Sequence, residues 1–192
     1  MHIALLGATG RVGRRVLALA LQDGHHVTAM VRNPDKLICQ SERLIVQPGD
    51  VCRYEDDLAV MKQADLVISC LSTDGAEVLT ESMPKLIGAM KEHNLERIVT
   101  VGTAGILNSR EYPGLLRYET PDTRRSSTRA AEEHRRAWEL LSASGLAWTV
   151  VCPTYLPDGD AVGEYRAEAE YLPEGACRFP LETRQCLFTK KL

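Results

Sequence analysis

Short apolar runs alternate with longer amphipathic segments from the first residue to about residue 152. A short hydrophobic run is typical of a buried parallel strand, and apolar positions that recur about every 3.6 residues are typical of a helix covering a sheet. This alternation predicts repeated βα units. The predicted strands are residues 3–6, 27–31, 44–46, 65–71, 98–101 and 148–152, and the predicted helices are 11–22, 33–36, 55–62, 78–93, 126–144 and 183–191.

The predicted strands and their helical connections together indicate the fold class. They favour an α/β protein with a doubly wound, Rossmann-type parallel sheet in the strand order 3-2-1-4-5-6. A chain of 192 residues, 44% of them hydrophobic and 26% charged, has the size and balance of one globular domain. We therefore predict a single domain over residues 1–192, rich in loops from about residue 153.

The predicted helix at 126–144 combines an apolar stripe with many charges. The stripe predicts a buried face formed by Ala130, His134, Ala137, Trp138 and Leu141. The acids Glu132, Glu133 and Glu139 are interspersed among the basic residues Arg124, Arg125, Arg129, Arg135 and Arg136. This mixture predicts a solvated face laced with ion pairs rather than a binding surface for an anion.

Composition and charge exclude several classes of function. The formal net charge is −3 and aromatic residues make up 5% of the chain, so neither the basic excess nor the stacking side chains of a nucleic-acid binder are present. No apolar stretch approaches the ~20 residues of a membrane span. We expect no nucleic-acid partner and no membrane association.

The six cysteines are scattered, and the N-terminus lacks the features of a leader. No two cysteines form a C-x-x-C pair, which favours reduced thiols. The first residues contain neither a basic segment nor a small-residue cleavage site. Both observations predict a cytoplasmic location.

A glycine-rich segment lies directly between the first predicted strand and the first predicted helix. Gly7 permits a tight turn, Gly10 lets the backbone approach a phosphate, and Gly13 lets the helix pack close to the strand. Backbone N–H groups at this position can bind a pyrophosphate. The alternative is a glycine-rich turn without a ligand. The position of the glycines favours dinucleotide binding.

The end of the second strand bears on the choice of cofactor. NAD-selective folds place an acidic side chain there for the ribose 2′-hydroxyl, whereas this strand is followed by Arg32. A guanidinium suits a 2′-phosphate, and Arg11 could add a second cation. NADP(H) is therefore the predicted cofactor. NAD(H) stays possible because Asp35 could reach a ribose, and both arginines could instead be solvated surface charges.

Four motifs in this order carry a resemblance to a known family. The chain resembles the atypical short-chain dehydrogenase/reductases, and within them the NAD(P)H-binding group that includes biliverdin reductase B, also called flavin reductase, and the NmrA-like redox-sensing proteins. The motifs are Gly7-Ala8-Thr9-Gly10-Arg11-Val12-Gly13, Val31-Arg32-Asn33-Pro34-Asp35-Lys36-Leu37, Gly49-Asp50-Val51 and Ser144-Gly145-Leu146-Ala147-Trp148-Thr149-Val150-Val151-Cys152-Pro153. The resemblance extends to about residue 166, and residues 175–192 retain only a trace of the family's last strand and helix, which implies a reduced C-terminal substrate region.

The resemblance implies a role for individual residues. The glycine loop, with Thr9, Gly10, Arg11 and Val12, would hold the pyrophosphate. Arg32 would hold the 2′-phosphate. The remaining implied contacts are Asp50 and Val51 with adenine, Leu71 and Ser72 with the adenosine side, and Thr103, Pro153, Thr154 and Tyr155 with the nicotinamide.

One feature of the wider superfamily is missing. Typical members use a Tyr-x-x-x-Lys pair in which the lysine lowers the pKa of the tyrosine for proton transfer. Here Tyr112 is followed four residues later by Leu116, and Tyr118 by Asp122. The flavin and tetrapyrrole reductases that the chain resembles also lack this pair and take protons from solvent or from the acceptor, so its absence does not exclude catalysis.

Three residues are candidates for a part in the chemistry. Thr103 could orient the carboxamide or the acceptor, or it could cap a turn. His134, which matches a histidine of the flavin reductase branch, could donate a proton or could be a packed helix residue. Tyr155 could cover an acceptor pocket or could serve packing alone. His25, His26, Asp56 and Asp57 lack metal-ligand spacing, so no metal site is predicted.

Two functions fit these observations. The first is an NADPH-dependent oxidoreductase that passes a hydride to a flavin or a similar conjugated acceptor, such as a quinone or a tetrapyrrole. The alternative is a non-catalytic NADP(H)-binding redox sensor of the NmrA-like type, which would act on a protein partner. The sequence predicts no oligomeric state.

Overall fold

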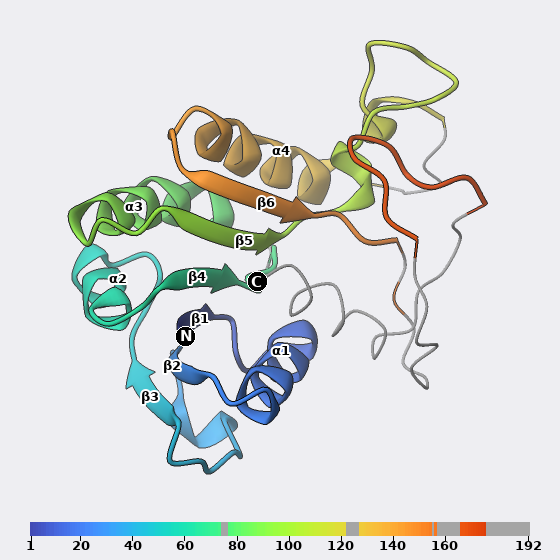
Figure 1. Cartoon of the computed structure of the whole chain (residues 1–192). Helices are drawn as coiled ribbons and strands as arrows, with labels where there is room; N and C mark the ends of the chain where they lie inside the picture. The colour runs from blue at the N-terminus through green and yellow to red at the C-terminus, as the bar shows by residue number, and fades with distance from the viewer. Residues whose placement is uncertain (74–76, 122–126, 155, 157–165, 176–192) are drawn as a thin grey trace.

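Six parallel strands form one sheet in the order β3-β2-β1-β4-β5-β6, which confirms the predicted topology (Figure 1). The computed structural model describes residues 1–73, 77–121, 127–154, 156 and 166–175. The strands are β1 (His2–Leu6), β2 (His26–Val31), β3 (Leu44–Pro48), β4 (Leu66–Ser69), β5 (Arg97–Val101) and β6 (Ala147–Val151). Each predicted strand is found, with shifts at its ends.

Helices cover both faces of the sheet (Figure 1). The helix α1 (Arg11–Gln22) packs on one face, while α2 (Tyr54–Met61), α3 (Val78–Glu92) and α4 (Arg129–Ser142) pack on the other. Both faces of β1 and β4 are therefore buried, because alternate side chains of these strands enter the two cores. The predicted helix at 183–191 lies outside the described residues.

Three short 3₁₀ helices, η1 (Pro34–Lys36), η2 (Ala104–Ile106) and η3 (Arg117–Glu119), complete the described elements. η1 lies where the sequence predicted a helix at 33–36, with the Asn33 side chain accepting a hydrogen bond from the Asp35 N–H and Pro34 at the first position. No helix in the part of the chain that the structure describes is long and apolar enough to cross a membrane.

The buried face of α4 differs from the predicted one. Ala137 and Leu141 are buried as expected, but Ala130, His134 and Trp138 are only half-buried. Ala131 and Glu133 take their place in the interior, and Glu133 is 2% exposed. The prediction that Glu133 lies on a solvated face is wrong, because a backbone N–H of α3 offers its carboxylate a buried hydrogen-bond partner.

Two segments lie side by side beyond the carboxyl ends of β5 and β6 (Figure 1). The Asn108 N–H donates to the carbonyl of Glu170 over 2.9 Å, and the Arg110 guanidinium lies 4.9 Å from the ring centre of Tyr171. Residues 107–117 and 166–175 therefore form one rim above this end of the sheet. Open α/β sheets bind ligands at the carboxyl ends of their strands.

Candidate functional site

The glycine loop joins β1 to α1 through contacts that exclude larger residues. Gly7 has a φ of +76°, and a Cβ built there would lie 2.6 Å from the Cys70 carbonyl oxygen. A Cβ at Gly13 would lie 2.0 Å from the Gly7 carbonyl oxygen. The tight turn and the close approach of helix to strand thus occur where the sequence predicted them.

The N-terminus of α1 is open for an anion. Gly10 is its N-cap residue, and among the described residues no side chain caps its N–H groups and no acid lies in its first turn. Uncapped N–H groups at a helix start need a partner, and the helix dipole favours a negatively charged one. A cofactor phosphate meets both requirements.

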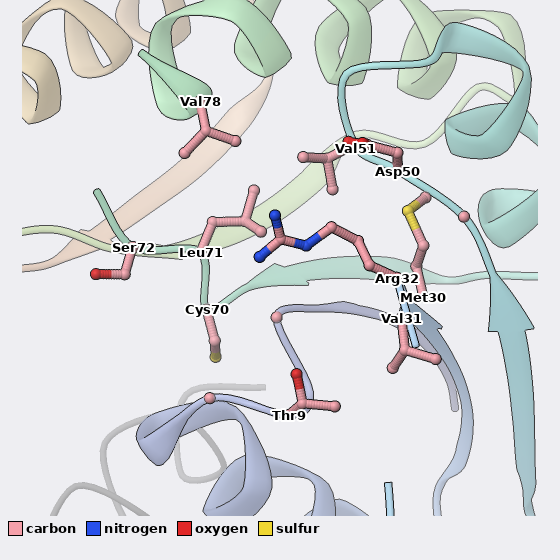
Figure 2. A pocket seen from close by; sticks show the side chains of 13 residues that line it. Thr9, Met30, Val31, Arg32, Asp50, Val51, Cys70, Leu71, Ser72 and Val78 are labelled. Atoms are coloured by element: carbon pink, nitrogen blue, oxygen red, sulfur yellow. The ribbon is translucent and has the colours of Figure 1, made fainter. Parts of the chain in front are cut away.

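A pocket of about 200 Å³ opens beside this helix start, at the carboxyl ends of the central strands. Figure 2 shows its walls, which come from the glycine loop, β2, the chain after β3 and β4, and α3. Eight of the predicted cofactor residues line it, namely Gly7, Thr9, Gly10, Arg32, Asp50, Val51, Leu71 and Ser72. Sequence reasoning missed Met30, Val31, Gly49, Cys70 and Val78.

Most of the missed residues are next to predicted ones in the sequence. Val31 and Gly49 lie inside the motifs but were given no role, Met30 precedes Val31, and Cys70 precedes Leu71. Val78 is different, because it lies at the start of α3, outside every motif. Only the packing of α3 beside β4 brings it to the pocket.

The Arg32 side chain reaches across the middle of the pocket toward Leu71, with Thr9 on one side and Asp50 and Val51 on the other (Figure 2). A guanidinium in this place can pair with a phosphate on the adenosine half of a dinucleotide. Asp35, the residue that could have favoured NAD(H), is exposed and does not line the pocket.

The loop after β3 is fixed by two carboxylates. The Asp50 N–H donates to Asp56 over 2.9 Å, and the Asp50 side chain accepts from the Cys52 N–H over 3.0 Å. These hydrogen bonds hold the backbone at Asp50 and Val51 in one conformation at the pocket wall.

A buried acid near this loop escaped sequence reasoning. Asp57 is 0% exposed, and neither carboxylate oxygen has a hydrogen-bond partner among the described residues. Burial, reinforced by the negative charges of Asp56 and Asp50, raises the pKa of Asp57 to about 8. Asp57 therefore carries a proton at neutral pH.

Three further predicted cofactor residues lie on α1 outside the pocket. Val12 and Gly13 follow the loop in the first turn, and Gly13 is buried against it. The Arg11 guanidinium donates to the carbonyl oxygen of Leu156 over 3.1 Å. Arg11 therefore contacts the chain after β6.

The predicted nicotinamide residues meet at the ends of β5 and β6. Thr103 is 8% exposed, and its hydroxyl accepts the Gly105 N–H over 3.4 Å, so it caps the turn into η2. The Ala104 N–H donates to the Pro153 carbonyl over 3.3 Å. The Thr154 hydroxyl is buried without a hydrogen-bond partner in the described part of the chain, which leaves it available to a polar group such as a carboxamide.

The other candidate chemical groups occupy different positions. His134 is half-buried on α4 and does not line the pocket, and Tyr155 lies outside the described residues. Burial raises the pKa of the Cys152 thiol to about 12, so this thiol is not a nucleophile at neutral pH. Within the described ranges no three His, Cys, Asp or Glu side chains gather as metal ligands.

The residues present fit a nicotinamide dinucleotide. The glycine loop leaves room where a Cβ would intrude, the start of α1 offers uncapped N–H groups, and the orphaned Thr154 hydroxyl lies toward the other end of the sheet edge.

Comparisons with known proteins agree with this geometry. The model of a family described as NAD(P)H-binding matches residues 7–176. The uncharacterised protein YwnB of Bacillus subtilis is 29% identical over 171 residues, which cover 86% of this chain and 78% of that protein.

Two solved structures share the fold over almost the whole chain. A candidate NADH-flavin reductase from Streptococcus pneumoniae is 24% identical with a TM-score of 0.81, covering 100% of this chain and 92% of that one. ChuY, an anaerobillin reductase from Escherichia coli O157:H7, is 23% identical with a TM-score of 0.80, covering 99% and 89%. With its glycine loop, its strand order and the family match, the chain belongs to the NAD(P)H-binding family.

Proposed function

We propose that this protein is an NADPH-dependent oxidoreductase that passes a hydride to a flavin or to a similar conjugated acceptor. The observation that carries the cofactor half of the proposal is the place of Arg32, whose guanidinium enters the pocket beside the open start of α1. A 2′-phosphate would be paired there, whereas the ribose of NADH offers no charge to pair.

The chain divides the binding of the cofactor among three regions. The glycine loop and the first turn of α1, with Thr9, Arg11 and Val12, would hold the pyrophosphate. Arg32 would hold the 2′-phosphate, and Asp50, Val51, Leu71 and Ser72 would enclose the adenosine half. When bound, NADPH would supply the hydride.

The residues at the ends of β5 and β6 would orient the nicotinamide. Pro153 and Thr154 would line one edge, with the free hydroxyl of Thr154 as a hydrogen-bonding group, and Thr103 would stand beside the ring. Tyr155 would cover the acceptor, and His134 would act indirectly. Catalysis would then depend on positioning and on the exclusion of water rather than on a side-chain acid.

The electron balance requires no further reactant. Two electrons and one proton leave NADPH as a hydride, and the acceptor takes a second proton from solvent, which yields NADP⁺ and the reduced acceptor. The names of the two structural neighbours, a candidate NADH-flavin reductase and an anaerobillin reductase, support an acceptor that is flat and conjugated.

The proposal is tested by steady-state oxidation of NADPH with free flavin, quinone and biliverdin, repeated with NADH. We expect saturable turnover with at least one acceptor and a lower KM for NADPH than for NADH. Tight NADPH binding without turnover on any acceptor would overturn the catalytic half of the proposal.

A non-catalytic redox sensor is the second candidate, and one observation favours it. The hydroxyl of Thr103 already caps a turn, and the Tyr-Lys pair is missing, so no group in the described chain is held ready for proton transfer. A sensor requires different affinities for NADPH and NADP⁺, because a ligand shifts a conformational equilibrium only through differential binding. Titration with both nucleotides, in the absence of turnover, distinguishes the two candidates.

A further inference from the structure

The N-terminus of α3 is capped by a carboxylate from another helix. Glu133 on α4 is buried, and its Oε1 accepts the backbone N–H of Leu79 over 2.8 Å. Leu79 is the second residue of α3, so this N–H has no partner within its own helix. A charged acceptor at a helix start is stabilised by the hydrogen bond and by the helix dipole together.

The helix α3 supplies no cap of its own. Its N-cap residue, Glu77, makes no capping hydrogen bond and instead pairs with Arg136 of α4 over 2.9 Å. The second oxygen of Glu133 lies 3.9 Å from Arg129. The helix α4 therefore holds the start of α3 through two interactions. The Glu133 carboxylate accepts the Leu79 N–H, and the Arg136 guanidinium pairs with Glu77.

The first turn of α3 also forms part of the wall of the proposed cofactor pocket. Val78, which precedes Leu79, lines the pocket, and so do Leu71 and Ser72, which follow β4 at the start of the connection toward α3 (Figure 2). A change in the position of the first turn of α3 would move this wall relative to Arg32 and the glycine loop. The geometry of the pocket thus depends on a residue that does not touch it.

We infer that Glu133 is a positioning residue of the cofactor site. It acts through the Leu79 N–H and holds Val78 and the chain after β4 in the place that the adenosine half of the nucleotide requires. This inference rests on the proposed cofactor site. The exchange of the Leu79 amide in the cofactor-free protein tests it separately, because that measurement needs no bound nucleotide.

The test compares variants at this position that differ in reach and charge. Glu133→Leu removes the acceptor, Glu133→Asp keeps the charge but shortens the side chain by one methylene, and Glu133→Gln keeps an acceptor oxygen at the same reach. Glu132→Leu is the matched control, because Glu132 lies on the same turn and bonds only its own helix, through Thr128. Hydrogen exchange reports the Leu79 amide, and fluorescence titration reports the dissociation constant of NADPH.

Glu133→Leu and Glu133→Asp should speed exchange of the Leu79 amide and weaken NADPH binding, by about tenfold for Leu and at least about threefold for Asp. Glu133→Gln should retain most of the protection and bind NADPH within about threefold of the parent protein. In turnover, the loss should appear in KM for NADPH with kcat unchanged, which a general loss of stability would not produce. The control should leave exchange and affinity unchanged.

Three results would overturn the inference. Unchanged exchange at Leu79 in Glu133→Leu would show that the cap is absent. Faster exchange with an unchanged dissociation constant would show that the cap does not position the pocket. If Glu133→Leu fails to fold, an unchanged NADPH affinity in Glu133→Asp has the same meaning. A parent protein that protects Leu79 but binds neither nucleotide would instead overturn the proposed cofactor site, and the positioning role with it.

Discussion

The N-termini of α1 and α3 border the same pocket and differ in what meets them. The start of α1 has a glycine at its cap, no acid in its first turn and no capping side chain among the described residues. The start of α3 is closed by Glu133, with Glu77 and Glu81 close to it in sequence. Both helix starts carry partial positive charge, so the difference lies in the side chains supplied to them.

This contrast shows how the chain separates support from binding. Where a carboxylate from α4 accepts the Leu79 N–H, one N–H of the start of α3 is bound by another helix, and this turn forms part of the pocket wall. At the start of α1 no side chain of the described residues caps the helix, and its N–H groups can bind a ligand phosphate. In the proposed site, the lack of an acid in the first turn of α1 would favour an anion as much as the glycines do.

The largest effect on stability and on NADPH binding is expected where α1 packs closely against the glycine loop, at Gly13. In Gly13→Ala the new Cβ would clash with the Gly7 carbonyl oxygen at 2.0 Å, and the clash could be relieved only by moving the backbone of α1 or of the glycine loop. We expect a loss of at least about 3 kcal/mol in the free energy of unfolding and an NADPH affinity lower by at least about a hundredfold. Denaturant unfolding and fluorescence titration measure the two effects.

Gly88→Ala is the control for this prediction. Gly88 lies in α3, and a Cβ there would meet only the ring of Tyr54 at 3.2 Å, so the change should alter stability by less than about 1 kcal/mol. Wild-type NADPH affinity in Gly13→Ala would show that the loop is not a phosphate site.

The next largest effect is expected from removing the positive charge of Arg32 from the pocket. Arg32→Ala should weaken NADPH binding by about 1.5 to 3 kcal/mol and leave NADH binding nearly unchanged, because only NADPH carries the 2′-phosphate. Arg43→Ala, an exposed arginine at the base of the neighbouring strand, serves as the control. Equal losses for the two nucleotides would contradict the assignment of Arg32 to the 2′-phosphate.

Asp57 is a second buried acid, and unlike Glu133 it accepts no hydrogen bond from the described residues. Its pKa is about 8 in the folded protein against 3.8 for an ordinary aspartate. Between these values the folded state binds the additional proton, so the free energy of unfolding falls as the pH rises. Asp57 should account for a fall of about 2 kcal/mol between about pH 6 and pH 7.5.

Denaturant unfolding at these two pH values, compared with Asp57→Asn, checks this contribution. The variant should lose most of the pH dependence and be more stable than the parent protein at the higher pH. A variant with the same slope as the parent would show that Asp57 does not hold the proton.

The smallest effect is expected from a substitution that places an acid at the start of α1, as Glu133 does at the start of α3. Gly10→Asp places a carboxylate at the cap, and its φ of −74° is accessible to aspartate. The new Cβ would lie 3.2 Å from the Gly7 carbonyl oxygen, a tight contact that Gly10→Asn shares, so the gain from the cap and the cost of the contact should leave stability within about 1 kcal/mol of the parent protein. NADPH binding should be about tenfold weaker in Gly10→Asp than in Gly10→Asn, because the carboxylate repels the phosphates. Gly10→Asn, which caps equally well without the charge, is the matched control. Equal affinities in the two variants would show that charge at this helix start does not govern binding.

The elements were predictable because local pattern sets each of them, and the strand order was predictable because repeated βα units pack in few arrangements. The apolar runs locate the strands, and Asn33-Pro34 marks the start of η1 before any tertiary contact is known. Eight pocket residues were also predictable, since the motifs that contain them lie at strand ends that a parallel sheet brings to one edge.

The predictions that failed, or that sequence could not make, involve contacts between helices. The stripe on α4 could not reveal that Glu133 is buried, because a carboxylate is expected at the surface unless a distant N–H is known to meet it. Val78 and Asp57 are of the same kind: one reaches the pocket through the packing of α3, and the other is enclosed by α2 and its neighbours.

The sequence by itself determined the βα order, the glycine loop and the placement of a cation after β2, because each depends on residues close together in the chain. Only the tertiary structure decided which helix start remains open and which is closed. The Leu79 N–H and the Glu133 carboxylate are 54 residues apart, and the environment of a buried charge depends on the groups packed around it rather than on its neighbours in sequence.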